Sequence, residues 1–149
     1  MKSHFSFLLL IGASLLIFSC DSNSDEDCLT VTPNENYALS GTAQMADFTP
    51  ATKTYTVSNT CDSDVMLSVE EDVRWLDVDI PAFGGGGNEA GTLNADSSIE
   101  VTVEIRYGSD NPERLDQLAA GMYEADLEFI DESNNATIVR VVNLTVNSP

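Results

Sequence analysis

Apolar and polar residues alternate with a period of two along most of the chain beyond residue 28. In Ser98–Tyr107, every odd-numbered residue is apolar and every even-numbered residue is polar. Because successive side chains of a strand point to opposite faces, this pattern predicts a strand with one buried face. The same criteria predict seven strands, at residues 29–33, 53–60, 65–69, 75–80, 98–107, 122–129 and 138–146.

Turn-forming residues separate these strands, at positions 62–64, 83–91, 94–97, 108–112 and 131–135. Only residues 112–121 depart from the pattern: Pro112 at the start and Gly121 at the end predict a short helix or helical turn. Short strands without alternating helices predict an all-β fold, an immunoglobulin-like antiparallel β-sandwich of about seven strands. The order Gly121-Met122-Tyr123 at a strand start is compatible with a tyrosine corner.

The amino-terminal segment has the features of an export signal. Lys2 precedes an apolar run of about 14 residues, which is too short to span a bilayer as a helix. The sequence Leu16-Ile17-Phe18-Ser19-Cys20 then resembles the lipobox of bacterial lipoproteins, which implies cleavage before Cys20 and acylation of Cys20. The alternative is an ordinary signal peptide with an incidental cysteine. We therefore expect a signal peptide at residues 1–19, an acidic tether at 20–27 and a folded domain at 28–149.

The charge balance narrows the function classes. The chain has 25 acidic and six basic residues, a formal charge of −19, and loss of residues 1–19 makes the charge −20. Such a potential repels phosphate backbones, so nucleic-acid binding is excluded. His4 lies in the expected signal peptide, so the mature chain has no imidazole for a triad or a zinc site. We expect a monomeric protein that is not an enzyme and carries no cofactor.

Two cysteines remain if Cys20 is acylated. Cys28 and Cys61 would lie in an oxidising compartment, at the start of the first predicted strand and the end of the second. Antiparallel pairing would bring them together, so we predict a disulfide that closes a loop of about 34 residues and contributes about 3–4 kcal/mol. Two free thiols are the alternative; without a histidine, two cysteines make a poor metal site.

The order of strand motifs resembles BACON-type immunoglobulin-like domains. The run 48–60 is similar to the F-x-P-x-x-x-x-Y-x-[LV]-x-N-T opening of that family. Similar motifs follow in register at Trp75-Leu76-x-Val78, the turn 91–93, and residues 99–103, 120–129 and 140–146. The glycines at 84–87 and Cys61 depart from the family pattern. The resemblance implies a binding or spacer module of bacterial envelope proteins, for which carbohydrate or mucin binding has been suggested.

Two candidate ligand contacts have structural alternatives. Trp75 could stack on a sugar ring, but its strand motif favours a core position. The glycine-rich loop is either mobile or closes over a ligand, with an exposed Phe83 at its base as an anchor. Its residues are Phe83, Gly84, Gly85, Gly86, Gly87 and Asn88.

Carboxylates cluster at three places, where they could bind Ca²⁺. The clusters are Asp62/Asp64, Glu70/Glu71/Asp72 and Asp77/Asp79. None matches an EF-hand loop, so we expect solvated acidic surfaces and no metal site. The leading functional hypothesis is a non-catalytic, lipid-anchored envelope module for binding or adhesion to a glycan or a protein. The alternative is a structural or accessory subunit of an envelope complex, and for localisation we favour the outer over the inner membrane.

The expected anchor can be tested directly. Mass spectrometry of the native protein should find an acylated peptide that begins at Cys20, because each buried methylene of an acyl chain contributes about 0.8 kcal/mol to membrane binding. Cys20→Ala should release soluble protein or leave uncleaved precursor. A soluble, unmodified mature form of the wild type would contradict the anchor.

Overall fold

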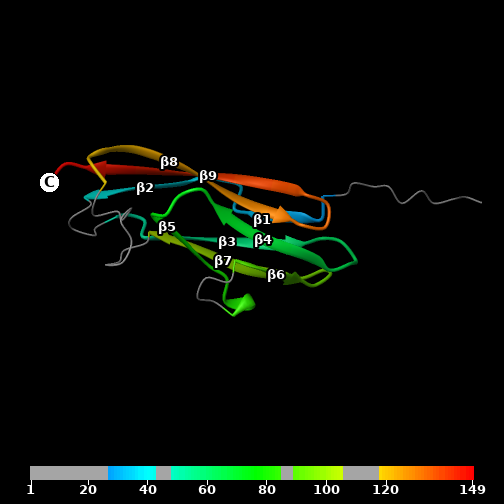
Figure 1. Cartoon of the computed structure of the whole chain (residues 1–149). Helices are drawn as coiled ribbons and strands as arrows, with labels where there is room; N and C mark the ends of the chain where they lie inside the picture. Colours follow the sequence, from blue (N-terminus) through cyan, green and yellow to red (C-terminus); the bar gives the residue numbers. More distant parts are fainter. Residues whose placement is uncertain (1–26, 43–47, 85–88, 106–117) are drawn as a thin grey trace, which may run out of the picture.

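The computed structural model describes residues 27–42, 48–84, 89–105 and 118–149. The expected signal peptide, Cys20, nearly all of the tether and residues 85–88 lie outside the described residues. Within them, the chain forms nine strands and one 3₁₀ helix, η1 (Pro81–Phe83) (Figure 1). The strands are β1 (Leu29–Thr32), β2 (Tyr37–Thr42), β3 (Thr52–Asn59), β4 (Val65–Glu71), β5 (Leu76–Asp79), β6 (Ala90–Leu93), β7 (Ser98–Ile105), β8 (Gly121–Asp131) and β9 (Ala136–Asn147).

All seven predicted strands are present, and the all-β sandwich is confirmed. β2 and β6 were not predicted from the sequence. β2 has only six residues and contains Gly41, while β6 has four residues of which only Leu93 is buried. Residues 91–93, expected as a turn, therefore pair with β4 instead.

The strands form two packed sheets, one in the order β1-β3-β7-β5 and the other in the order β2-β9-β8-β4-β6. Neighbouring strands are antiparallel except β2 and β9, which are parallel with Tyr37 opposite Val142. This pair corrects the expectation of a wholly antiparallel sandwich. It arises because β1 and β2 follow one another in the chain but belong to different sheets, so the first part of the chain crosses from one sheet to the other.

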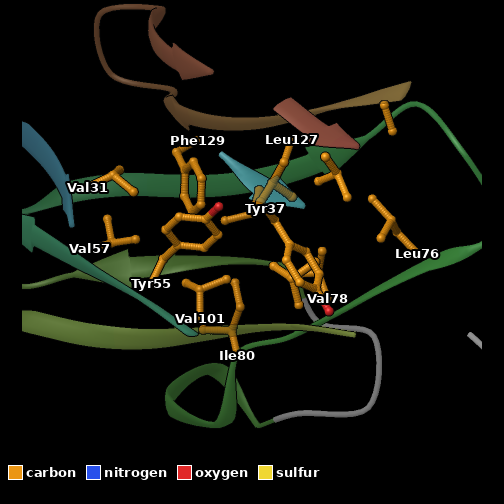
Figure 2. Packing of buried hydrophobic residues seen from close by; sticks show 14 of the residues in the cluster. Val31, Tyr37, Tyr55, Val57, Leu76, Val78, Ile80, Val101, Leu127 and Phe129 are labelled. Carbon is orange, nitrogen blue, oxygen red and sulfur yellow. The ribbon is translucent and has the colours of Figure 1, made fainter. Parts of the chain in front are cut away.

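The core lies between the two sheets and is built by the alternating residues. In β7, Val101 and Val103 are fully buried, whereas Glu100 and Glu104 are exposed. The rings of Tyr55 in β3 and Phe129 in β8 meet edge to face at 5.5 Å between centroids, and they join the two sheets at the centre of the core (Figure 2). Trp75 is 5% exposed, which confirms its core position over the sugar-platform interpretation.

The connection before β8 contains the tyrosine corner with which the order Gly121-Met122-Tyr123 is compatible. The Tyr123 hydroxyl donates to the Ala119 carbonyl at 2.9 Å, as in the tyrosine corner of immunoglobulin-like domains. The helical turn expected at 112–121 lies mostly outside the described residues, and Gly121 begins β8. No helix within the described residues is long and apolar enough to cross a bilayer.

Replacing Phe129 tests the inter-sheet contact. Phe129→Ala should lower the free energy of unfolding by about 3–5 kcal/mol, because it empties a fully buried site and removes the contact with Tyr55. Met122→Ala is the control, since Met122 is 83% exposed and its loss should change stability by no more than about 0.5 kcal/mol. Urea unfolding curves measure both; equal effects of the two substitutions would contradict the proposed core.

Candidate binding face

The predicted disulfide between Cys28 and Cys61 is present, with the two Cα atoms 5.2 Å apart. It joins the residue before β1 to the turn after β3, and Leu29 lies opposite Asn59 as the antiparallel arrangement requires. Asn59 is buried and organises this turn, which the sequence analysis did not foresee. Its Nδ2 donates to the carbonyls of Ser63 and Leu93, and its Oδ1 accepts from the Cys61 amide at 3.0 Å.

The candidate ligand loop is only partly described. Phe83 is half-buried and packs against the core, so it is not the exposed anchor that the sequence analysis expected. Its ring lies so close to Gly91 that a Cβ there would be 2.5 Å from Phe83 Cδ1. Gly84 ends η1 in a left-handed conformation, with φ of 106°. The remaining residues of the loop, 85–88, lie outside the described part.

Two of the three acidic clusters are separate surface features. Asp62 and Asp64 lie in the β3–β4 turn, where Asp64 Oδ1 accepts from the Ala95 amide. Asp77 and Asp79 point outward from β5, between the buried Leu76, Val78 and Ile80. Among the described residues, no three histidine, cysteine or acidic side chains are grouped so as to hold a metal ion.

The third acidic cluster is larger than the sequence indicated. The end of β4 pairs with the middle of β8, with Glu70 directly opposite Glu128 and Glu71 opposite Leu127. Glu70, Glu71, Asp72, Asp126 and Glu128 thereby line one open pocket of about 160 Å³. Asp126 and Glu128 were not predicted as part of this site, because only the β4–β8 register brings them to Glu70.

We call the surface around this pocket the acidic face; it is formed by Glu70, Asp72, Asp126 and Glu128. Like charges directly opposite one another across antiparallel strands are destabilising, by a few tenths of a kcal/mol or more. In the described part of the chain, no ion pair is formed by Glu70, Asp126 or Glu128. Asp72 Oδ1 accepts from the backbone amide of Asp126, which holds the Asp72 carboxylate beside β8. A cationic ligand would relieve the repulsion.

The opposite surface of the sandwich has a different chemistry. Every outward position of β1, β3, β5 and β7 carries a hydroxyl or a carboxylate. The hydroxyls face one another across the strands, and Ser98 Oγ donates to Ser58 Oγ at 2.8 Å. These residues are Thr30, Thr32, Thr52, Thr54, Thr56, Ser58, Asp77, Asp79, Ser98, Glu100, Thr102 and Glu104.

A polar cluster surrounds Tyr55 where the chain crosses between sheets. The Tyr55 hydroxyl donates to the Glu35 carbonyl at 3.2 Å, and Lys53 pairs with the Glu35 carboxylate at 2.9 Å. Lys53 Nζ also lies 5.8 Å from the Tyr55 ring centroid. Burial raises the pKa of Tyr55 to about 12; the positive charge of Arg140 acts against this rise and the negative charge of Glu35 adds to it.

Arg140 covers the part of the β9 edge that β2 does not reach. β2 pairs with β9 only from Val142 onward, so none of the described strands pairs with the first half of β9 on that side. Arg140 Nη1 donates to the Val139 carbonyl, and its Nη2 donates to the Val31 carbonyl of β1 at 2.8 Å. Asn36 Oδ1 accepts from the Val141 amide. These side chains satisfy backbone groups that would otherwise be an exposed sheet edge.

No protein-family model matches the chain, and no curated protein is similar to it in sequence. Among solved structures, PapD-like domain 7 of human CEP192 has a TM-score of 0.50 at 12% identity, over 99% of each chain. A family 123 glycoside hydrolase from Clostridium perfringens has a TM-score of 0.51 at 7% identity, over 76% of this chain and 23% of the hydrolase. The Pseudomonas aeruginosa CupB2 chaperone has a TM-score of 0.47 at 8% identity, over 74% of this chain, which spans about half the length of that chaperone. The similarity to the CEP192 domain supports an immunoglobulin-like β-sandwich fold.

The buried Tyr55 predicts a loss of stability in alkali. Its pKa rises from 10.0 to about 12 on folding, so the stabilisation is complete below pH 10 and is lost as the pH rises through 12. The loss should be about 2–3 kcal/mol. Tyr55→Phe should unfold with a shallower dependence on pH between 10 and 12, as measured by urea midpoints in matched buffers. Identical pH dependence of the two proteins would exclude Tyr55 as the titrating group.

Proposed function

We propose that this protein is a non-catalytic binding module of the bacterial cell envelope, tethered through an acylated Cys20. Support for the anchor comes from the apolar run and the Leu16–Cys20 motif. Support for a BACON-type module comes from the order of strand motifs, and the immunoglobulin-like fold is consistent with it. The acidic residues at 21–27 would act as an extended, self-repelling spacer between lipid and domain.

The acidic face is the observation that carries the binding role. Four carboxylates are held together on an open sheet surface, at a cost in like-charge repulsion that packing does not require. The ligand that complements this surface is a protein segment with exposed lysine or arginine side chains. A protein partner is favoured over a glycan, because Trp75 is used in the core and offers no stacking surface.

The open geometry also favours binding over catalysis. Paired carboxylates of glycosidases flank the scissile bond of a bound sugar, whereas Glu70 and Glu128 lie side by side on the surface of a sheet. Recognition through the β2 and β9 edges, which the alternative role as an accessory subunit would use, is less favoured. Arg140 covers part of the β9 edge, and Ser40 of β2 already exchanges two backbone hydrogen bonds with Thr49.

Charge removal tests the face. Cells that produce wild-type protein, or the Glu70→Gln/Glu128→Gln variant, are cross-linked, and the proteins recovered with each are quantified by mass spectrometry. The variant should recover its main partner about tenfold less well, because two interfacial charges are lost. The recovery by wild type should also fall as NaCl is raised before cross-linking.

Glu100→Gln/Glu104→Gln is the matched control, since it removes the same charge from the opposite surface. It should recover the partner like wild type. Melting curves should show both variants folded. Equal recovery by the two variants, or binding to a neutral glycan that is insensitive to salt, would contradict the proposed face.

A further inference from the structure

We propose that the Cys28–Cys61 bridge carries tension from the amino-terminal tether past β1 and into the central strands of the domain. The biological use of this arrangement rests on the proposed anchor at Cys20. The mechanical behaviour itself belongs to the domain and can be tested without any lipid.

Without the bridge, β1 is the weak point for a pull from the amino-terminal side. It has four residues and pairs with β3 alone, as the edge strand of its sheet. The chain enters at Cys28, directly before the first pair, Leu29 opposite Asn59. A pull at that end is resisted only by the four residue pairs that join β1 to β3. Only Leu29 and Val31 hold β1 in the core by side-chain burial.

The bridge moves the point of attachment to the other side of this pairing. Cys61 follows β3, which lies between β1 and β7, and precedes β4, which lies between β8 and β6. Tension that enters at Cys61 therefore reaches an interior strand of each sheet. Each of these strands has partners on both sides, so the force is shared among many hydrogen bonds.

The turn that receives the tension is fastened to its surroundings. The Cys61 amide donates to Asn59 Oδ1, and the Cys61 carbonyl accepts from the Asp96 amide at 3.1 Å. On the tether side, the Cys28 carbonyl accepts from both the amide and the hydroxyl of Thr60. Asn59 Nδ2 further ties the turn to the Leu93 carbonyl at the end of β6. Cys61 is thus held to β3, to the end of β6 and to the β6–β7 turn independently of β1.

A pull applied between the two ends of the domain acts roughly along the strands. The start of β1 and the carboxyl terminus lie at opposite ends of the sandwich (Figure 1). With the bridge closed, residues 29–60 lie inside a covalent loop and cannot be extended by such a pull. The loop contains β1, β2 and β3, including the parallel pairing of β2 with β9. The bridge thereby shields the segment that joins the two sheets.

Single-molecule stretching in optical tweezers tests this inference. The mature chain from residue 20, with Cys20→Ser to leave only the two bridging cysteines, is held by handles at its two ends. The reduced protein and the Cys28→Ser/Cys61→Ser variant should both show an early extension of at most about 30 Å, the contour length of residues 28–36, which are released ahead of β2. The oxidised protein should show no such step.

The length of full unfolding checks the state of the bridge in each molecule. It should be shorter by about 110–120 Å in the oxidised protein, because 33 residues remain locked. Val142→Ala with the bridge intact is the matched control, since it weakens the core and leaves the residues of β1 unchanged. It should unfold at lower force yet lack the early step.

An early step in the oxidised protein, or its absence from the reduced one, would overturn the proposal. Failure of the anchor would be seen separately, as a native protein without acylated Cys20. In that case the stretching result would still stand for the domain.

Discussion

The short segment from β1 to β2 contributes one strand to each sheet, and the rest of the sandwich depends on how the chain crosses from one sheet to the other. β1 completes one sheet beside β3, and β2 completes the other beside β9. Neither strand is long enough to cover its neighbour fully. The crossing therefore leaves backbone groups of β9 and β1 unpaired, and buried or edge groups of this kind destabilise a fold unless they find partners.

The partners come from side chains gathered at the crossing. Arg140 donates to both sheets, and the hydroxyl of Tyr55 reaches the backbone of Glu35 in the crossing itself. Few basic residues exist in this acidic chain, and Lys53 and Arg140 are used here for structure. The Cys28–Cys61 bridge fastens the other end of β1. Within the described residues, Glu70, Asp126 and Glu128 of the acidic face form no ion pair.

The sequence predicted those features of the fold that depend on the local pattern of apolar and polar residues. Alternation in β7 and β8 is long and regular, so strand type and buried face were both correct, and the disulfide followed from two strand ends. β6 was missed because four residues carry almost no periodicity. The meeting of Glu70 with Glu128 could not be predicted, because it depends on the β4–β8 register, which joins residues 58 positions apart. The role of Arg140 could not be predicted either, because its charge in an inward position is explained only by its hydrogen bond to the Val31 carbonyl.

The hydroxyl-rich outer surface of the β1-β3-β7-β5 sheet has a practical consequence for protein engineering. Its side chains do not enter the core, so single replacements there should change stability by no more than about 0.5 kcal/mol. The strands beneath them are held by buried valines and by Tyr55, which stay untouched. New recognition residues could therefore be placed on this surface while the acidic face is left unchanged, which would give the domain two separate surfaces for binding.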